Sequence, residues 1–209
     1  LTGQARFCDL DFYVTPDVLV PRSPLAELIA EQFSPWLEIV AGSRVLDMCT
    51  GGGCIAIAIA VHMPGIFVYA VDISTKSLEM AARNVVRHQA QDSVSLVQSD
   101  LFSGLGDRHY DLIVSNPPYI GRGEASAMDE RVLEHEPDEA LFVDDHDPLI
   151  FYRRISEVGG QLLNQKRTIY LELNATHGDE TKRLFEQQGW KAKLYADMSG
   201  NARFLKVWS

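Results

Sequence analysis

Short apolar runs alternate with longer amphipathic stretches along this chain from about residue 44 to its end. The apolar runs have the length and β-branched content of strands, and they cover residues 45–48, 67–71, 94–97, 111–114, 168–173, 190–195 and 202–208. The stretches between them predict helices over residues 54–62, 148–158 and 179–188, and a further helix that begins at Ser74 or Thr75. Strands that alternate with helices predict an α/β fold with a doubly wound, mostly parallel sheet of seven strands. The short connection between the last two strands adds an antiparallel strand pair at one edge.

The first 24 residues have a different pattern. Residues 1–22 alternate loosely between apolar and polar positions around Thr15-Pro16-Asp17, which predicts a β-hairpin with its turn there. A helix with apolar residues at helical spacing follows over residues 25–33. We therefore divide the chain into a β-hairpin linker, residues 1–24, and a main domain, residues 25–209. Within that domain, residues 121–147 are polar and are predicted to form a loop.

The composition fits one globular core. The chain has 209 residues, of which 46% are hydrophobic, and no apolar run approaches the roughly 18 residues that a membrane span needs. The net charge of −10 argues against nonspecific nucleic-acid binding, which relies on Lys and Arg, so direct binding of nucleic acid is not expected. Cys8, Cys49 and Cys54 form no CxxC pair, which indicates reduced thiols in a cytoplasmic protein. The six histidines lack metal-ligand spacing, so no metal is expected.

A glycine-rich turn and two carboxylates follow three of the predicted strands. The turn, Asp47 to Gly53, lies between the first strand and its helix, where glycines let a ligand approach the backbone. Asp72 ends the second strand, where a carboxylate can accept both hydroxyls of a ribose. Asp100 ends the third strand, and Leu101 and Phe102 follow it, which suits the amino group and ring of an adenine. The G-x-G-x-x-G pattern of nicotinamide-binding proteins is absent.

The tetrapeptide Asn116-Pro117-Pro118-Tyr119 directly follows an apolar strand. Each proline fixes its own φ and restricts the residue before it, so the turn is rigid. The Asn116 side-chain oxygen and the Pro117 carbonyl can each accept one N–H of a planar NH2 group. These two acceptors would orient the nitrogen of the NH2 group toward a methyl donor and stabilise the charge that develops on this nitrogen during transfer. Asn116 and Pro117 are therefore the predicted catalytic residues. Tyr119 could stack on the planar acceptor.

These features together favour S-adenosylmethionine over a nicotinamide cofactor. The predicted cofactor-binding residues are Asp47, Cys49, Thr50, Gly51, Gly52, Gly53, Asp72, Ile73, Asp100, Leu101, Phe102 and Asn116. The predicted substrate-binding residues are Asn116, Pro117, Pro118, Tyr119 and Arg22, the last of which follows a predicted strand near the cleft. For Arg22, a salt-bridged position in the linker is an equal alternative.

Several motifs together resemble the HemK-type protein-glutamine methyltransferases. Besides the tetrapeptide, they are Phe12-Tyr13-Val14, Val18-Leu19-Val20-Pro21-Arg22, Asp72-Ile73-Ser74 and His135-Glu136-Pro137. The resemblance covers essentially the whole chain and implies a Rossmann-like class I methyltransferase fold, with S-adenosylmethionine as donor and S-adenosylhomocysteine as product. It also implies methylation of a glutamine side-chain amide in a translation protein, most often in the Gly-Gly-Gln motif of peptide chain release factors. In the family the Asn of the tetrapeptide binds the glutamine amide, a role that carries over to Asn116.

The chain departs from the family pattern in two ways. The family usually carries an N-terminal helical domain for substrate docking, and this chain begins where the connecting hairpin would begin. Its motifs are also mixed. Residues 21–24 and 46–51, with Cys49, resemble the branch that methylates a large-subunit ribosomal protein. Residues 134–137, 140–143, 147–149 and 199–203 resemble the release-factor branch. The acceptor is therefore open between the two proteins, and the chain is either an unusual natural member or a chimera.

The same residues allow other interpretations. Adenine-amino methyltransferases of DNA and RNA share the Asn-Pro-Pro-Tyr tetrapeptide and would flip a base against it. A regulatory module that binds the cofactor without catalysis is a third class. Glu134-His135-Glu136 could be a catalytic cluster, although a solvated loop is the favoured interpretation. Asp144-Asp145-His146-Asp147 has a metal-like composition, but four consecutive residues rarely converge on one ion.

Overall fold

A twisted sheet of seven strands runs through the centre of the computed structural model, which describes residues 3–34, 39–164, 168–196 and 200–209. The strands are β3 (Arg44–Met48), β4 (Phe67–Asp72), β5 (Val94–Gln98), β6 (Leu112–Ser115), β9 (Thr168–Glu172), β10 (Lys191–Ala196) and β11 (Ala202–Trp208). Their order across the sheet is β10-β11-β9-β6-β3-β4-β5. The pairs from β9 to β5 are parallel, whereas β11 lies antiparallel to both β9 and β10. The mostly parallel sheet with an antiparallel C-terminal pair is thus confirmed.

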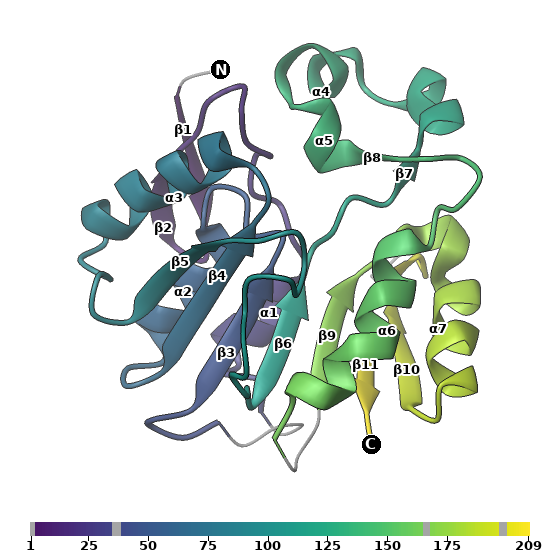
Figure 1. The fold of residues 1–209 in the computed structure, drawn as a ribbon. Helices are drawn as coiled ribbons and strands as arrows, with labels where there is room; N and C mark the ends of the chain where they lie inside the picture. Colours follow the sequence, from purple (N-terminus) through teal and green to yellow (C-terminus); the bar gives the residue numbers. More distant parts are fainter. Residues whose placement is uncertain (1–2, 35–38, 165–167, 197–199) are drawn as a thin grey trace.

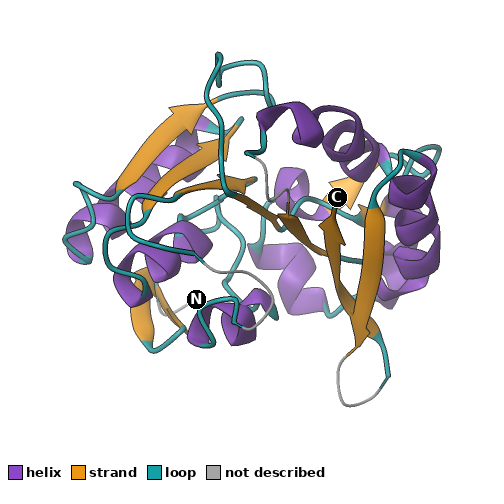
Figure 2. Ribbon diagram, turned by 90° about the horizontal axis from the view of Figure 1, so that it is seen from below, coloured by secondary structure: helices purple, strands orange, loops and turns teal. Residues whose placement is uncertain are grey.

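Helices cover both faces of this sheet (Figures 1 and 2). They are α1 (Leu25–Ala30), α2 (Cys54–His62) and α3 (Thr75–Arg87) on one face, with α6 (Ile150–Leu162) and α7 (Gly178–Gln187) on the other. Side chains of successive strand residues point to opposite faces, so Val45 joins the first core and Leu46 the second. Helix α2 begins and ends at the residues that the sequence predicts. Among the described residues, no helix combines the length and apolar character that crossing a membrane requires.

The strand order places a crevice at the carboxyl ends of the central strands. From β3 the chain proceeds to β4 and β5 on one side, and later to β6 and β9 on the other. The helices that follow β3 and β6 therefore leave the sheet toward opposite faces, and the space between them opens beyond the carboxyl ends of both strands. The residues after β3, β4, β5 and β6 meet there. Asp100 lies two residues beyond the end of β5, slightly later than expected.

The N-terminal hairpin exists, but its turn is not where the sequence predicts it. Its strands are β1 (Gln4–Phe7) and β2 (Leu10–Tyr13), joined by Cys8 and Asp9, which have φ values of +48° and +59°. This is a tight left-handed turn of the kind that Asn-Gly usually signals, so Cys-Asp gives little warning of it. Thr15-Pro16-Asp17 forms a separate turn, in which the Val18 N–H donates to the Thr15 carbonyl at 3.2 Å. Residues 1 and 2 of the predicted hairpin lie outside the described residues.

Residues 121–147 are not the plain loop that the sequence predicts. They contain the 3₁₀ helix η1 (Arg122–Ala127), α4 (Glu130–His135), α5 (Asp138–Leu141) and β8 (Phe142–Val143), which pairs in parallel with β7 (Ile120–Gly121). Each element is too short to show helical or strand periodicity in the sequence. Figure 1 shows this segment beyond the carboxyl ends of β6 and β9. A second 3₁₀ helix, η2 (Ala175–His177), precedes α7.

Candidate active site

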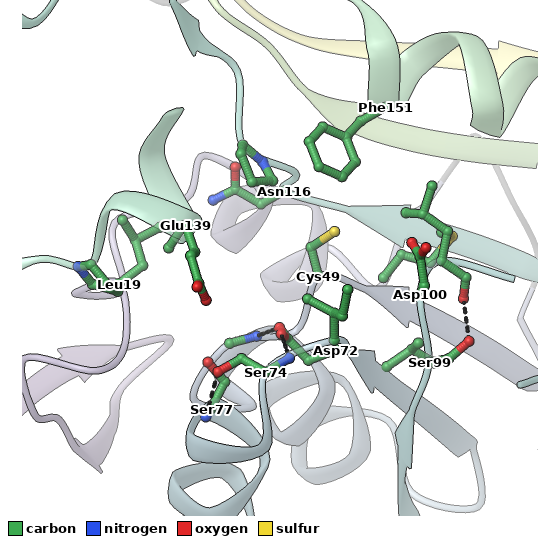
Figure 3. A pocket seen from close by; sticks show the side chains of 18 of the residues that line it. Leu19, Cys49, Asp72, Ser74, Ser77, Ser99, Asp100, Asn116, Glu139 and Phe151 are labelled. Carbon is green, nitrogen blue, oxygen red and sulfur yellow. Dashed lines mark hydrogen bonds between the residues drawn. The ribbon is translucent and has the colours of Figure 1, made fainter. Parts of the chain in front are cut away.

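A pocket of about 900 Å³, including its open mouth, occupies the crevice (Figure 3). Its walls come from the ends of β3 to β6, the N-terminus of α3, the segment after the hairpin, α5 and α6. The predicted cofactor residues that line it are Cys49, Gly51, Asp72, Ile73, Asp100, Leu101 and Asn116, and Pro118 joins them. Five other predicted cofactor residues do not line this pocket: Asp47, Thr50, Gly52, Gly53 and Phe102. The fold therefore brings only part of the predicted set together.

The glycine turn, residues 51–53, is built from backbone that favours glycine. Gly51 and Gly53 have φ values of +54° and +81°. A Cβ on Gly53 would come within 3.1 Å of the Ala81 Cβ on α3, whereas a Cβ on Gly51 would meet nothing within 4 Å. Gly53 is therefore required for close packing, and Gly51 leaves its backbone open to a ligand. Cys49 adopts φ +60°, a conformation that costs a non-glycine residue about 1–2 kcal/mol.

Asp47 lies beneath the glycine turn and supports it. The side chain is 0% exposed, and its Oδ2 accepts hydrogen bonds from Thr50 Oγ1 at 2.6 Å and from the Ala56 N–H at 3.1 Å. Burial raises the pKa of the Asp47 carboxyl to about 7, against the opposing effect of these two hydrogen bonds. Asp47 therefore orders the turn from below and does not line the pocket.

The raised pKa of Asp47 gives a testable pH dependence of stability. Between the ordinary value of 3.8 and about 7, the folded state holds a proton on Asp47 that the unfolded chain has lost. The free energy of unfolding should therefore fall as pH rises through this window. In Asp47→Asn this fall should be smaller, because the amide does not titrate. Urea denaturation at about pH 5 and about pH 8 gives the change in the free energy of unfolding for each protein. The difference between the two changes reports on Asp47, because the other titrating groups are the same in both proteins. An equally steep fall in the variant would contradict this assignment.

Asp72 connects the glycine turn to α3 at the floor of the pocket. Its Oδ2 accepts the Gly51 N–H at 2.8 Å, and its Oδ1 accepts the Ser74 N–H at 2.9 Å. Burial raises the pKa of Asp72, although these hydrogen bonds favour its charged form. Ser74 in turn caps α3 by accepting the Ser77 N–H, which resolves the predicted choice between Ser74 and Thr75 in favour of Ser74.

The tetrapeptide follows β6 at the centre of the sheet. Asn116 and Pro118 line the pocket, whereas Pro117 and Tyr119 do not. The Tyr119 hydroxyl donates to Glu172 Oε1 at 2.9 Å, and its carbonyl accepts from Asn174 Nδ2 at 3.2 Å. Burial raises the pKa values of Tyr119 and Glu172. The neighbouring strand β9 thus fixes the far end of the tetrapeptide, so the orientation of Asn116 does not depend on the prolines alone.

A second cavity, of about 410 Å³ including its open mouth, adjoins the first. The two share Leu19, Cys49, Gly51 and Asn116, and the second is also lined by Phe7, Pro21, Arg22, Ser23, Thr50, Gly52, Cys54 and Ile55. Asn116 is therefore one of the four residues at which the two cavities meet. This arrangement can bring two different molecules into contact at one side chain, which the order of residues in the sequence does not reveal.

Arg22 lines the second cavity and is also salt-bridged. Its Nη2 donates to Glu136 Oε2 at 3.0 Å, and the Glu136 side chain is only 4% exposed. The expectation of a solvated loop at residues 134–136 is thus wrong for Glu136, because Arg22 compensates its buried charge. This ion pair fixes the segment that contains α5 against the linker.

Several pocket residues were not predicted. Asp17, Leu19, Ser77, Glu139 and Phe151 line the first cavity, and each comes from a segment distant in sequence from the glycine turn. Figure 3 shows Asn116, Asp72, Asp100 and Glu139 around the central space. Among the described residues that line it, four are acidic and none is Lys, Arg or His. Such a lining favours a positively charged ligand and disfavours phosphate.

The remaining polar motifs have structural partners. Asp145 accepts the Gly123 N–H, and Asp147 forms an ion pair with Arg153 at 2.8 Å. In the part of the chain that the structure describes, no three potential metal-binding side chains are placed to share an ion. All three cysteines are described and none forms a disulfide. Ser199, in one of the motifs assigned to the release-factor branch, lies outside the described residues.

Comparison with known proteins agrees with this geometry. Residues 26–139 match the Methyltransferase small domain family. A release factor glutamine methyltransferase from Bacteroides thetaiotaomicron is 40% identical over 98% of this chain and 73% of its own length. A ribosomal protein uL3 glutamine methyltransferase from Xanthomonas campestris pv. campestris is 50% identical over 68% of this chain, which spans only 45% of that relative.

A solved structure extends the similarity to the fold. The release-factor-specific protein-(glutamine-N5) methyltransferase of Alicyclobacillus acidocaldarius is 29% identical, with a TM-score of 0.54 over 94% of this chain and 98% of that chain. The fold, the pocket at the switch point and the sequence similarity thus lead to one conclusion. This chain belongs to the HemK-type family of protein-glutamine methyltransferases.

Proposed function

We propose that this protein transfers a methyl group from S-adenosylmethionine to the side-chain amide nitrogen of a glutamine in a translation protein, in the cytoplasm. The observation that carries the proposal is the position of Asn116 where two cavities meet. One cavity would hold the methyl donor and the other the acceptor side chain. Residues 25–209 would then form the methyltransferase domain, and residues 1–24 the linker to it.

The first cavity has the chemistry of a site for S-adenosylmethionine. That donor supplies a methyl group on a positively charged sulfonium, which suits a pocket with four carboxylates and no cationic side chain among its described residues. Asp72 would accept the ribose hydroxyls, and Asp100 the adenine amino group. Ile73, which is 61% exposed, and Leu101 would cover the adenine faces. Gly51 leaves room for the ligand beside the backbone.

Asn116 and Pro117 would orient the acceptor. An amide nitrogen is a poor nucleophile because its lone pair is delocalised into the carbonyl. The Asn116 side-chain oxygen and the Pro117 carbonyl would each accept one of its N–H groups, which aims the nitrogen at the donor and favours the charge that grows there. Pro118 and Tyr119 would complete the rigid turn, and Arg22 would bind the acceptor at the second cavity.

A release factor is the first candidate acceptor, because its methyltransferases match nearly the whole chain. The alternative acceptor is ribosomal protein uL3. It is favoured because a uL3 glutamine methyltransferase is 50% identical to this chain, although the match covers only 68% of it. Nucleic acid is disfavoured, because acidic residues outnumber basic ones in the segment 121–147 beside the pocket.

The proposal is tested by offering three acceptors in parallel. Purified protein and S-adenosylmethionine with a labelled methyl group are incubated with a release factor, with uL3 and with adenine-bearing RNA. We expect label in one of the two proteins, and its loss when the acceptor glutamine is replaced by alanine. Label in RNA alone would contradict the proposal.

The charge of the pocket gives a further prediction. Glu139→Gln removes one carboxylate from the lining and should weaken S-adenosylmethionine binding by a few-fold, because Glu139 is exposed and its field is screened by water. The difference should shrink at high salt. Glu134→Gln on α4 is the matched control, since Glu134 is also exposed but does not line the pocket. Isothermal titration calorimetry measures both. Equal affinity of the two variants at low salt would contradict this role of Glu139.

A further inference from the structure

Asn84 is a buried amide on α3 that the proposed reaction does not use. Its side chain is 0% exposed and makes three hydrogen bonds. Its Oδ1 accepts the Tyr13 N–H at 2.8 Å, and its Nδ2 donates to the Tyr13 carbonyl at 3.1 Å and to the Gly52 carbonyl at 2.9 Å. Both amide hydrogens and the oxygen are therefore paired. One side chain thus joins the hairpin, α3 and the glycine turn, which are far apart in the sequence.

The glycine turn depends on this face of α3 for its shape. Gly51 and Gly53 are both in left-handed conformations, and glycine backbone has more conformational freedom than any other residue. Gly53 packs against Ala81, which lies three residues before Asn84 and therefore on the same face of α3. Asn84 adds a hydrogen bond to the carbonyl of Gly52, between the two. The turn is thus held from the side by α3 and from below by Asp47.

The hairpin has other contacts, with the last residue of α3 and with the residue that follows it, that do not reach the glycine turn. His88 Nε2 forms a hydrogen bond with the Asp11 carbonyl at 3.0 Å, and the His88 and Phe12 rings lie 4.9 Å apart. The Arg87 guanidinium lies 4.3 Å from the centroid of the Tyr13 ring. The contribution of these contacts to hairpin stability can therefore be separated from the link through Asn84.

We propose that Asn84 is a positioning residue that fixes the glycine turn for the methyl donor and couples the placement of the hairpin to the donor pocket. The identity of the donor rests on the function proposed above. Because Asn84 binds both segments, a ligand that orders the glycine turn should also stabilise the hairpin. By reciprocity, a partner that orders the hairpin should strengthen donor binding.

Two variants of Asn84 and one control test the coupling. Asn84→Asp keeps the acceptor for the Tyr13 N–H but loses both donors, and Asn84→Leu removes all three hydrogen bonds at similar volume. We expect both to raise the Kd for S-adenosylmethionine at least tenfold. His88→Ala loosens the hairpin but keeps the hydrogen bond from Asn84 to the glycine turn, so its Kd should rise much less than the Kd values of the two Asn84 variants. Circular dichroism and thermal melting identify any variant that does not fold.

Hydrogen exchange distinguishes this coupling from a purely structural role of Asn84. Saturating S-adenosylmethionine should slow amide exchange in β1 and β2 of the unaltered chain and of His88→Ala, but not in Asn84→Asp. Unchanged exchange in the hairpin of the unaltered chain, or equal Kd values for the Asn84 and His88 variants, would overturn the proposal. Failure of the unaltered chain to bind S-adenosylmethionine at all would instead overturn the proposed donor, and with it this inference.

Discussion

Asn116→Ala should lower the rate of methyl transfer by roughly 10²–10³-fold or more, while the Kd for S-adenosylmethionine changes only slightly. Asn116 lies where the two cavities meet, and its side-chain oxygen is the proposed acceptor for one N–H of the target amide. Without this oxygen, the acceptor nitrogen is no longer oriented toward the methyl group, and the charge that develops on the nitrogen is no longer stabilised. Single-turnover transfer of labelled methyl, with calorimetric titration of the donor, separates the two effects.

A second asparagine provides the control for this experiment. Asn164 donates to Asp111 Oδ1 at 2.8 Å and lines neither cavity. Asn164→Ala should therefore transfer methyl groups at the rate of the unaltered chain. If Asn116→Ala instead loses donor binding and transfer to the same extent, Asn116 would be a residue for the donor or for folding, and the proposed role in orienting the acceptor would be wrong.

Asp72→Asn should raise the Kd for S-adenosylmethionine by roughly 10²-fold. A hydrogen bond to a charged group contributes about 1.5–3 kcal/mol, and Asp72 accepts two from backbone N–H groups in addition to its proposed bonds to the ribose. An amide in its place retains one acceptor oxygen, but its NH2 group would face a backbone N–H. The N-terminus of α3 and the glycine turn would then lose their shared anchor.

Asp111→Asn is a matched control for this loss. Asp111 also accepts a backbone N–H, that of Arg44 at 2.8 Å. Asp111 directly precedes β6 and so lies at the amino end of this strand, opposite the crevice. Both variants should lose some stability, and only Asp72→Asn should lose donor affinity. Thermal melting with calorimetric titration measures both quantities. Similar donor affinity in the two variants would remove Asp72 from the proposed binding site.

The sequence predicts the middle of the sheet well because β3, β6 and β9 are almost entirely buried. A strand that is buried on both faces is mostly apolar, as in β6, and the helix between two such strands has to cover one face. Asp72 and Asp100 are recognisable for the same reason. A carboxylate at the end of an apolar strand, or just beyond it, lies where the crevice opens.

Features that depend on contacts between distant segments could not be predicted in this way. The turn at Cys8 and Asp9 is compatible with a hairpin whose Phe7 and Phe12 side chains belong to the same core as α1 and α2, and no turn residue signals it in the sequence. Glu136 looks solvated in the sequence because its ion pair with Arg22 spans 114 residues. Glu139 lines the pocket from the segment that this ion pair contacts. The second cavity is likewise a product of the tertiary fold.

The most direct test of the central claim identifies the atom that receives the methyl group. The protein is incubated with S-adenosylmethionine that carries a ¹³C-methyl group and with release factor or uL3 that contains glutamine labelled with ¹⁵N in the side-chain amide. Nuclear magnetic resonance then reports whether the transferred carbon is bonded to that nitrogen. We expect a ¹³C–¹⁵N coupling from one glutamine in one of the two proteins, which disappears with Asn116→Ala. A transferred methyl carbon without this coupling, on any other atom, would contradict the account.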